Sequence, residues 1–425
     1  MKNKLWTKNF TILILGSVVS MLGNALSGFA ISLLVLDYTG SAASYSIYII
    51  AWTLPQIVMP IFSGAVLDRF SRRKTIYTLD FLSGLIYLGA SFVLGSGWFN
   101  FSIFIVVVFV IGLINSMYMV AYQSFFPMLV SEGNYQKAYS VSSFLEMLIA
   151  AAVPVSAFMY NSIGVAPLLR VNSLFFFTAA IAETFIRAEE KYIATQKENR
   201  TESRYGKQFL ADIKEGFAYL IGEKGLLAVA IYFTFSAFEG GAEQVVMLPY
   251  FKLNMNNLFH LQVFGWDISQ GEYLYMIVGF GAIFGRAFGG MYHYRKNLPV
   301  EKKFDIALFV YIITGIFAGV LLFVPIKFMV ILMFLSGICG ITSYTIRISA
   351  TQHYVPDERK GRFNGAFNML NTFGTLVGEL TAGLLTKFVD ERFVIAGINA
   401  ITIIAAIVFI GGRRKDIAPI YNTQN

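Results

Sequence analysis

Acidic side chains occur within long apolar stretches of this sequence, where an ionisable group carries a high free-energy cost. Four glutamates have this setting: Glu146, Glu239, Glu243 and Glu379. Desolvation favours the protonated form of a carboxyl group, so such a residue can bind and release a proton as its surroundings change. Glu239 and Glu243 are spaced i, i+4, which places them on one face of a helix. We expect these glutamates to be proton-binding candidates, with polar contacts between helices as the alternative.

The elements that must position these glutamates follow from the composition. Apolar residues make up 56% of the chain and charged residues only 14%, with a mean hydropathy of +0.63, unlike an ordinary soluble domain. A helix of about 20 apolar residues crosses the hydrocarbon core of a bilayer, which is roughly 30 Å thick. Twelve runs are long enough to do so, at residues 10–36, 43–66, 75–97, 101–123, 138–160, 167–187, 226–249, 272–292, 304–324, 328–350, 364–388 and 393–411. We therefore predict an all-α membrane protein with twelve transmembrane helices.

The first apolar run follows Lys2, Lys4 and Lys8, as the core of a signal peptide would. Its 27 uncharged residues exceed the roughly 7 to 15 residues of a cleavable core, so we predict that it is the first membrane helix.

Basic residues are concentrated in the connections on one side of the predicted membrane domain. Of the 33 Lys and Arg residues, 26 lie in the connections on the side of the two termini. The opposite side has four: Lys252, Lys327, Lys387 and Arg392. The positive-inside rule then predicts that both termini are cytoplasmic. It also explains the net charge of +8 without any binding of nucleic acid.

A polar stretch at residues 188–223 divides the chain into two parts with six predicted helices each, residues 1–187 and 224–425. The sequence GAVLDR at 64–69 recurs as GAIFGR at 281–286, in each case at the end of the second helix of its half. A looser similarity links residues 129–138 with 354–363. Parallel repeats of this kind are typical of transporters, so we predict two pseudo-symmetric six-helix halves joined by a cytoplasmic linker.

Several kinds of chemistry find no support in the sequence. No phosphate-binding loop of the Gly-x-x-x-x-Gly-Lys-Ser/Thr type is present, and the glycine-rich segment 279–290 lies within an apolar helix, where tight helix packing explains it. The single cysteine, Cys339, allows no intrachain disulfide. The three histidines lie in loops or at helix ends, without a metal-ligand cluster or a hydrolytic triad. We therefore expect no enzyme activity, no cofactor and no metal, and an ion gradient as the energy source.

A charged motif follows the second predicted helix. It comprises Gly64, Asp68, Arg69, Arg72 and Arg73, and matches the pattern Gly-x-x-x-Asp-Arg-x-Gly-Arg-Arg/Lys with Ser71 in place of the second glycine. Together with TGSA at 39–42, EGFAYL at 215–220 and VPDERKGR at 355–362, this motif resembles the major facilitator superfamily, and within it the drug-efflux branch that includes macrolide exporters. The resemblance covers essentially the whole chain.

The resemblance implies a role in gating for the charged motif. Asp68 is expected to meet the N-terminus of the eleventh helix, near residues 361–365, when the cytoplasmic side is closed. A carboxylate is stabilised there by the helix dipole, by about 0.3 to 1 kcal/mol when exposed. The alternative is that the motif only fixes the topology, which explains the arginines but not the aspartate.

The resemblance also implies that the first and fourth helices of each half line a central cavity. Glu239 and Glu243 on the seventh helix are then the leading proton candidates, and further cavity candidates are Asn24, Asn115, Gln123 and Arg347. Arg347 lies near a helix end, where snorkelling is an equal alternative. Asp80 and the Glu183/Arg187 pair also lie near helix ends, and we expect solvated local pairing for them.

Two positions depart from the family pattern. The arginine that many drug antiporters carry in the fourth helix is absent, and Ile111 occupies the best-matching position. The antiporter signature of the fifth helix, Gly-x-x-x-Gly-Pro, is reduced to Pro154 after three alanines. Export is therefore favoured by the overall likeness and not by intact motifs.

Together these features predict a transporter working by alternating access as a functional monomer in a bacterial plasma membrane. Its expected partners are the lipid bilayer, protons and an amphipathic or lipophilic small molecule, which it would export as a multidrug antiporter. An aromatic content of 16% would suit such substrates, although aromatic residues also face lipid. The alternatives are an importer or lipid flippase of the same fold, and a membrane sensor or scaffold that transports nothing.

Overall fold

The computed structural model describes residues 4–67, 71–131, 134–188, 190, 214–255, 261–263, 266–268, 270–295 and 298–422. Six long helices precede the polar stretch: α1 (Lys8–Thr39), α2 (Ala42–Leu67), α3 (Arg72–Gly95), α4 (Phe101–Leu129), α5 (Tyr135–Ile163) and α6 (Val165–Thr184). Six more follow it: α9 (Lys224–Asn254), α10 (Gly271–Arg295), α11 (Lys303–Val320), α12 (Ile326–Tyr354), α13 (Asp357–Leu385) and α14 (Glu391–Ala405). Each of the twelve coincides with a predicted membrane helix.

Shorter elements complete the described chain. The strands β1 (Leu261–Val263) and β2 (Trp266–Ile268) pair antiparallel between α9 and α10. Single 3-10 turns occupy Val300–Lys302 and Leu321–Phe323. After α14 the chain passes through a π-helical turn at Ala406–Ile410 and a 3-10 turn at Gly411–Arg413 into a last helix, α15 (Arg414–Tyr421).

The helices have the length and composition of membrane spans. Ten of the described helical segments are long and apolar enough to cross a bilayer, and α5 and α13 have the length of a span as well, which is consistent with twelve membrane helices. The predicted all-α architecture is thus confirmed. The largest difference in a boundary concerns α13, which begins at Asp357 and not near residue 364. Its first residues are charged, so the apolar pattern reveals only the later part of the helix.

Local sequence signals mark several helix ends. The side chains of Thr7, Ser71 and Asn100 accept hydrogen bonds from backbone N–H groups three residues later, as N-caps do. Helix α1 ends at Gly40, which adopts a left-handed conformation with φ of 56°. Glycine adopts this conformation without steric penalty, and the chain can therefore turn directly into α2.

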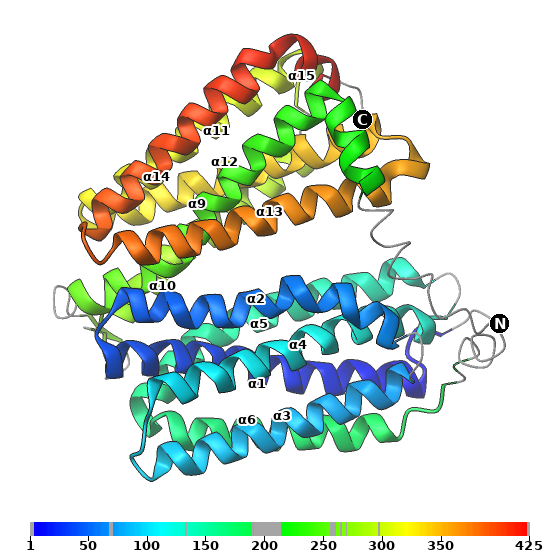
Figure 1. Ribbon diagram of the computed structural model, residues 1–425, viewed down its shortest axis with the longest axis vertical. Helices are drawn as coiled ribbons and strands as arrows, with labels where there is room; N and C mark the ends of the chain where they lie inside the picture. Colours follow the sequence, from blue (N-terminus) through cyan, green and yellow to red (C-terminus); the bar gives the residue numbers. More distant parts are fainter. Residues whose placement is uncertain are drawn as a thin grey trace. The chain divides into compact units, whose positions relative to one another are not determined.

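The chain divides into two compact units. The first unit comprises residues 1–40 and 48–207, and the second comprises residues 41–47 and 208–425. Within the first unit, α1 packs against α5 and α6, and α3 packs against α4 and α6 (Figure 1). A buried cluster around Phe10, Ile76 and Phe125 joins these helices.

Within the second unit, α9 packs along α13, α10 along α12, and α11 against α12 and α14 (Figure 1). Glycines set the close approach of two of these pairs. Gly378 of α13 lies against the backbone of Phe238 in α9, and Gly285 of α10 lies against the backbone of Phe334 in α12. A side chain at either position would collide with the neighbouring helix. The interpretation of the glycine-rich segment 279–290 as a packing surface is therefore confirmed.

Two short helices cover one end of the second unit. Of the predicted linker, residues 214–222 are helical, and Leu220 there is fully buried in the same apolar cluster as Ile417 of α15. Ion pairs join Glu215 to Arg362 at 2.5 Å and Asp305 to Arg414 at 2.9 Å. Both short helices are thus integral to the packing of the second unit.

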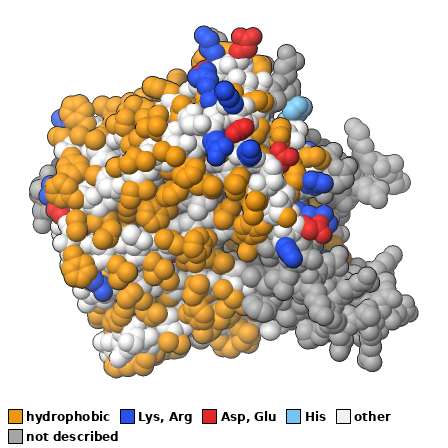
Figure 2. Space-filling view, turned by 45° about the horizontal axis from the view of Figure 1, so that its top comes forward, with side chains coloured by type: hydrophobic (Ala, Val, Ile, Leu, Met, Phe, Trp, Pro, Cys, Tyr) orange, Lys and Arg blue, Asp and Glu red, His pale blue; other side chains and the backbone are white. Residues whose placement is uncertain are grey.

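Apolar side chains also cover much of the outer surface. In Figure 2, hydrophobic side chains spread over most of the described face, while the charged side chains lie mostly toward the top and right of the view. Large side chains on the outer faces are widely exposed, among them Phe92, Leu174, Phe284 and Phe309 at 62% to 66%. Exposure of this extent is expected for helices that face lipid.

Candidate functional site

A cavity of about 230 Å³ lies within the second unit, among α9, α11 and α12. It combines aromatic rings, hydroxyl groups, one acidic and one basic side chain. Its lining comprises Tyr232, Phe233, Ser236, Glu239, Tyr311, Thr314, Gly315, Gly340, Ser343, Tyr344 and Arg347. Pockets of this type, with apolar walls and a few polar groups, are the usual form of a small-molecule site.

Arg347 is held in this cavity by aromatic side chains. Its guanidinium carbon lies 4.9 Å from the ring centres of both Phe233 and Phe367, and 5.7 Å from that of Tyr344. Contacts of this kind stabilise a cation by about 0.5 to 2 kcal/mol, depending on desolvation. The Arg347 Nε atom is buried and has no hydrogen-bond partner among the described residues. The side chain therefore lines the cavity and does not snorkel to a helix end.

Glu239 of α9 lines the same cavity as Arg347. Its carboxyl group lies within reach of the Thr402 hydroxyl of α14 and is close enough to Glu243 for the two charges to interact. Glu243 is one helical turn further along α9, as the spacing predicts, and does not line the cavity. Among the described residues, Glu239 and Arg347 make no ion pair with each other. Both charges are thus available to a third group in the cavity.

Tyrosines support one wall of the cavity. The Tyr311 hydroxyl is hydrogen-bonded to that of Tyr421 at 3.0 Å, and the rings of Tyr311 and Tyr232 lie 4.5 Å apart. Tyr421 belongs to α15 and is fully buried. These rings were not predicted as site residues, because in a chain this rich in Phe and Tyr the sequence does not distinguish a cavity wall from a lipid-facing surface.

A polar contact joins helices of the first unit. Asn24 Nδ2 donates to Asn115 Oδ1 at 3.4 Å, and the Tyr87 hydroxyl donates to Asn24 Oδ1 at 3.2 Å. The structure therefore brings the two predicted asparagines together, on α1 and α4. Gln123, the other residue predicted on α4, is exposed and does not take part in this contact.

Two further glutamates were predicted as proton-binding candidates, Glu379 and Glu146. Glu379 is fully buried in α13. Glu146 belongs to α5, and its side chain is outside the described residues. A role in proton binding stays a prediction for both.

Within the charged motif, the structure describes side-chain contacts for the two arginines at the start of α3, Arg72 and Arg73. Arg72 Nη1 donates to the Ser124 carbonyl oxygen of α4 at 3.1 Å, and Arg73 Nη1 donates to the Ile186 carbonyl oxygen after α6. They thus tie three helices of the first unit together. Asp68, Arg69 and the surroundings of Gly64 lie outside the described residues, so the latch stays a prediction.

The expectation of solvated pairing for Asp80 and Glu183 is wrong. Asp80 is 2% exposed and Glu183 is 0% exposed. Helices α3 and α6 pack closely, and the two buried side chains are near enough for their charges to interact. Distance from a helix end was a poor guide here, because burial is decided by the face and not by the position along the helix.

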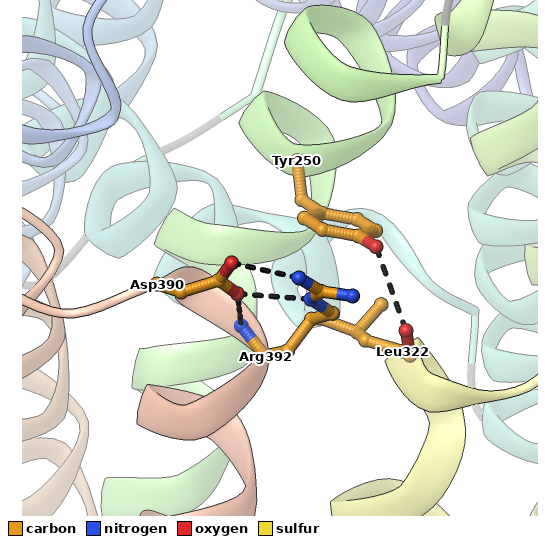
Figure 3. Close-up of polar contacts among 4 residues, drawn as sticks. All are labelled: Tyr250, Leu322, Asp390 and Arg392. Atoms are coloured by element: carbon orange, nitrogen blue, oxygen red, sulfur yellow. Dashed lines mark hydrogen bonds and ion pairs between the residues drawn. The ribbon is translucent and has the colours of Figure 1, made fainter.

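An exposed ion pair marks the start of α14, and neither of its residues lines the cavity (Figure 3). Arg392 donates from Nε and Nη2 to the two oxygens of Asp390, at 3.0 and 2.9 Å, and its backbone N–H caps the same carboxylate at 2.9 Å. These hydrogen bonds lower the pKa of the Asp390 carboxyl. Nearby, the Tyr250 hydroxyl donates to the Leu322 carbonyl oxygen at 3.5 Å. In the described part of the chain, no three His, Cys, Asp or Glu side chains are grouped as metal ligands.

Membrane-length helices in two units, one of which contains a cavity with an acidic and a basic side chain, define the class of multi-pass membrane proteins. The chain belongs to the Major Facilitator Superfamily, whose sequence profile matches residues 13–379 and 300–422. A relative in Bacillus subtilis (strain 168), the uncharacterized MFS-type transporter YkuC, is 24% identical over 303 residues, covering 69% of this chain and 68% of that protein.

Solved structures support the same fold. The peptide transporter POT in complex with sulfate is 13% identical with a TM-score of 0.68, covering 99% of this chain and 98% of that one. The nucleoside transporter NupG is 13% identical with a TM-score of 0.66, covering 94% and 98%. A bacterial homologue of the iron transporter ferroportin, in an inward-facing state, is 16% identical with a TM-score of 0.64, covering 96% and 99%. Identities this low establish the fold alone.

Proposed function

We propose that this chain is a proton-driven antiporter that exports amphipathic or lipophilic small molecules from a bacterial cell by alternating access, working as a monomer. The observation that carries this proposal is the cavity of the second unit, where Glu239, Arg347 and several aromatic rings converge. Aromatic walls favour an apolar substrate body, and the two charges favour a polar or charged group attached to it.

One carboxyl group can couple export to the proton gradient. A cationic substrate and a proton compete for the same Glu239 carboxylate, because either of them neutralises its charge. Binding of a proton from outside would therefore release the substrate, and loss of that proton to the cytoplasm would restore the site. Glu243 lies close enough to modulate this exchange through its charge.

Arg347 has a different role in this scheme. The guanidinium group is fixed by Phe233 and Phe367, so it presents a constant positive charge to the cavity. When the substrate leaves, this charge remains in the cavity that Glu239 also lines. The cavity of about 230 Å³ is smaller than a typical drug site of about 300 to 1,000 Å³, so it would hold one ring or chain of the substrate.

The test is the susceptibility of an efflux-deficient bacterial host to a panel of lipophilic antibiotics and dyes. Cells would express the wild type, Glu239→Gln or the matched control Asp390→Asn, which changes an exposed carboxylate outside the cavity. Expression should be equalised by membrane abundance. We expect resistance with the wild type and the control, and its loss with Glu239→Gln or with a protonophore.

Other outcomes would favour the other functions. Greater accumulation of a labelled compound in expressing cells would support import in place of export. Full tolerance of Glu239→Gln, with no substrate across the panel, would support a sensor or scaffold. Movement of labelled lipid between the leaflets of proteoliposomes would support a flippase.

A further inference from the structure

Two buried carboxyl groups meet within the first unit, far along the sequence from the cavity residues. Asp80 lies on α3 and Glu183 lies on α6, and both are inaccessible to solvent, with exposures of 2% and 0%. The two groups are close enough for their charges to repel each other. Burial of even one ionised carboxylate without a partner is strongly unfavourable, and burial of two adjacent ones is more so.

Helices α1 and α4 close this pair off with hydroxyl groups. Ser17, Ser20 and Tyr118 are all buried, with exposures of 0%, 1% and 5%. The Ser20 hydroxyl lies within reach of the Asp80 carboxyl, and the Tyr118 hydroxyl donates to Ser17 Oγ at 3.4 Å. The backbone of α1 is close as well, since a Cβ atom added at Gly16 would lie 3.1 Å from Glu183 Oε1.

No cation balances the pair in the described part of the chain. Helix α1 has no charged residue between Phe10 and Leu36. Among the described groups, the other titratable side chain that interacts with the two carboxyl groups is the phenol of Tyr118 on α4, which carries no positive charge. The arginines at the start of α3 donate elsewhere, Arg72 to Ser124 and Arg73 to Ile186. Asp80 Oδ2 and both oxygens of Glu183 have no hydrogen-bond partner among the residues that the structure describes. These buried oxygens therefore lack the donors that an ionised pair would need.

We propose that Asp80 and Glu183 form a second proton-binding site, in which one proton is held between the two carboxyl groups. The protonated carboxyl donates to the ionised one, which supplies the missing donor and removes the repulsion. Aspartic proteases use such a shared proton in their pair of carboxyls. The site takes up its proton from water and returns it to water when the pair becomes hydrated, and no other reactant is needed.

The site is placed to respond to movement of α1. This helix contributes Gly16, Ser17 and Ser20 to the surroundings of the pair and carries Asn24 one turn beyond Ser20. Displacement of α1 would admit water to both carboxyls and release the proton. The first unit would then have its own proton-linked element, which depends on neither the substrate nor the direction of transport proposed above.

The test is infrared spectroscopy of the purified full-length protein, using the C=O stretching band of protonated carboxylic acids as a function of pH. We expect the double variant Asp80→Asn/Glu183→Gln to lose one protonated carboxyl that the wild type holds at neutral pH. In each single variant, the remaining carboxyl no longer faces a like charge. Its titration midpoint should therefore fall by about one pH unit or more, which corresponds to a proton affinity about tenfold weaker.

Controls keep this result interpretable. Asp390→Asn should leave the band unchanged, because that exposed carboxylate is ionised at neutral pH. Ser20→Ala retains both carboxyls and removes a hydroxyl that stabilises the ionised form of Asp80, so the titration midpoint of the pair should rise. This variant provides the test if the other substitutions prevent folding. The proposal is overturned if the double variant retains the whole band, if the Ser20→Ala midpoint is unchanged, or if sodium abolishes the band at neutral pH, which would indicate a cation site.

Discussion

In the first unit, Asp80 and Glu183 face hydroxyl groups and are sealed from solvent, whereas in the second unit Glu239 shares a cavity with Arg347. The fourth helix of each half accounts for much of this difference. Helix α12 supplies Arg347 to its unit, while α4 has only uncharged residues between Phe101 and Leu129 and contributes Tyr118. A fixed cation keeps a cavity polar and open to a charged ligand. Without one, buried acids are best accommodated by closing the helices around them and holding a proton.

The comparison also shows how two repeats of related sequence diverge. The segment 64–69 of the first half retains Asp68 and Arg69, and its counterpart 281–286 has replaced the aspartate with Gly285. In the second unit this glycine serves the contact between α10 and α12. The two segments also differ in position, because residues 64–67 end α2, whereas 281–286 lie inside α10 and not at its end as predicted. Similar sequence in the two halves is therefore no guide to equivalent position or chemistry.

The largest effect is expected at Glu239, the acid that shares a cavity with a cation. Glu239→Gln should reduce pH-gradient-driven transport in proteoliposomes to the level of empty vesicles, whereas Glu243→Gln should lower the rate only in part. The reason is that Glu239 lines the cavity and Glu243 does not. Equal loss in both variants would contradict this distinction between the two glutamates.

A smaller effect is expected at Arg347, where the cation is retained but its planar form is lost. Arg347→Lys should weaken substrate binding by about tenfold, roughly 1.4 kcal/mol, because an ammonium group stacks poorly on Phe233 and Phe367. Arg347→Gln should be more severe. Binding by isothermal titration to the detergent-solubilised protein would measure both, and equal affinities in wild type and Arg347→Lys would argue against a role for stacking.

Hydroxyl contacts should have a modest effect that differs between the units. Tyr421→Phe removes the 3.0 Å bond to Tyr311 and should lower the free energy of unfolding by about 1 kcal/mol. Tyr118→Phe removes a longer contact of 3.4 Å to Ser17 and should lower the free energy of unfolding by a smaller amount. Thermal unfolding of the two purified variants gives the comparison, and the reverse order would show that the first unit depends more on its hydroxyl network.

The smallest effect is expected at the exposed pair outside both sites. Because Arg392 lowers the pKa of Asp390 in the folded protein, the pair stabilises the fold above the ordinary pKa of an aspartate, about 3.9, and this contribution is lost as the pH falls through the lowered value. Asp390→Asn should therefore change the melting temperature only slightly at neutral pH, and less still in strong acid. A larger change in acid than at neutral pH would reverse this assignment.

The sequence was sufficient to predict the long helices, because a helix that crosses the hydrocarbon core must be about 20 residues long and mainly apolar. It also singled out Glu239 and Arg347, which line the cavity, since an ionisable residue in an apolar run is conspicuous, and their roles stay predictions. It did not identify the pair of Asp80 and Glu183, because burial there depends on which faces of α3 and α6 meet. Nor did it separate Tyr311 from the many other aromatic residues, since only packing distinguishes a wall of a cavity from a surface in lipid.

The hydrogen bond between Tyr311 and Tyr421 has a practical consequence for work on this transporter. Tyr421 belongs to α15, a helix that contributes none of the cavity-lining residues, yet its hydroxyl is bonded to that of Tyr311 in the cavity wall. A label attached to α15 would therefore be expected to disturb the site, although this helix lies outside the lining.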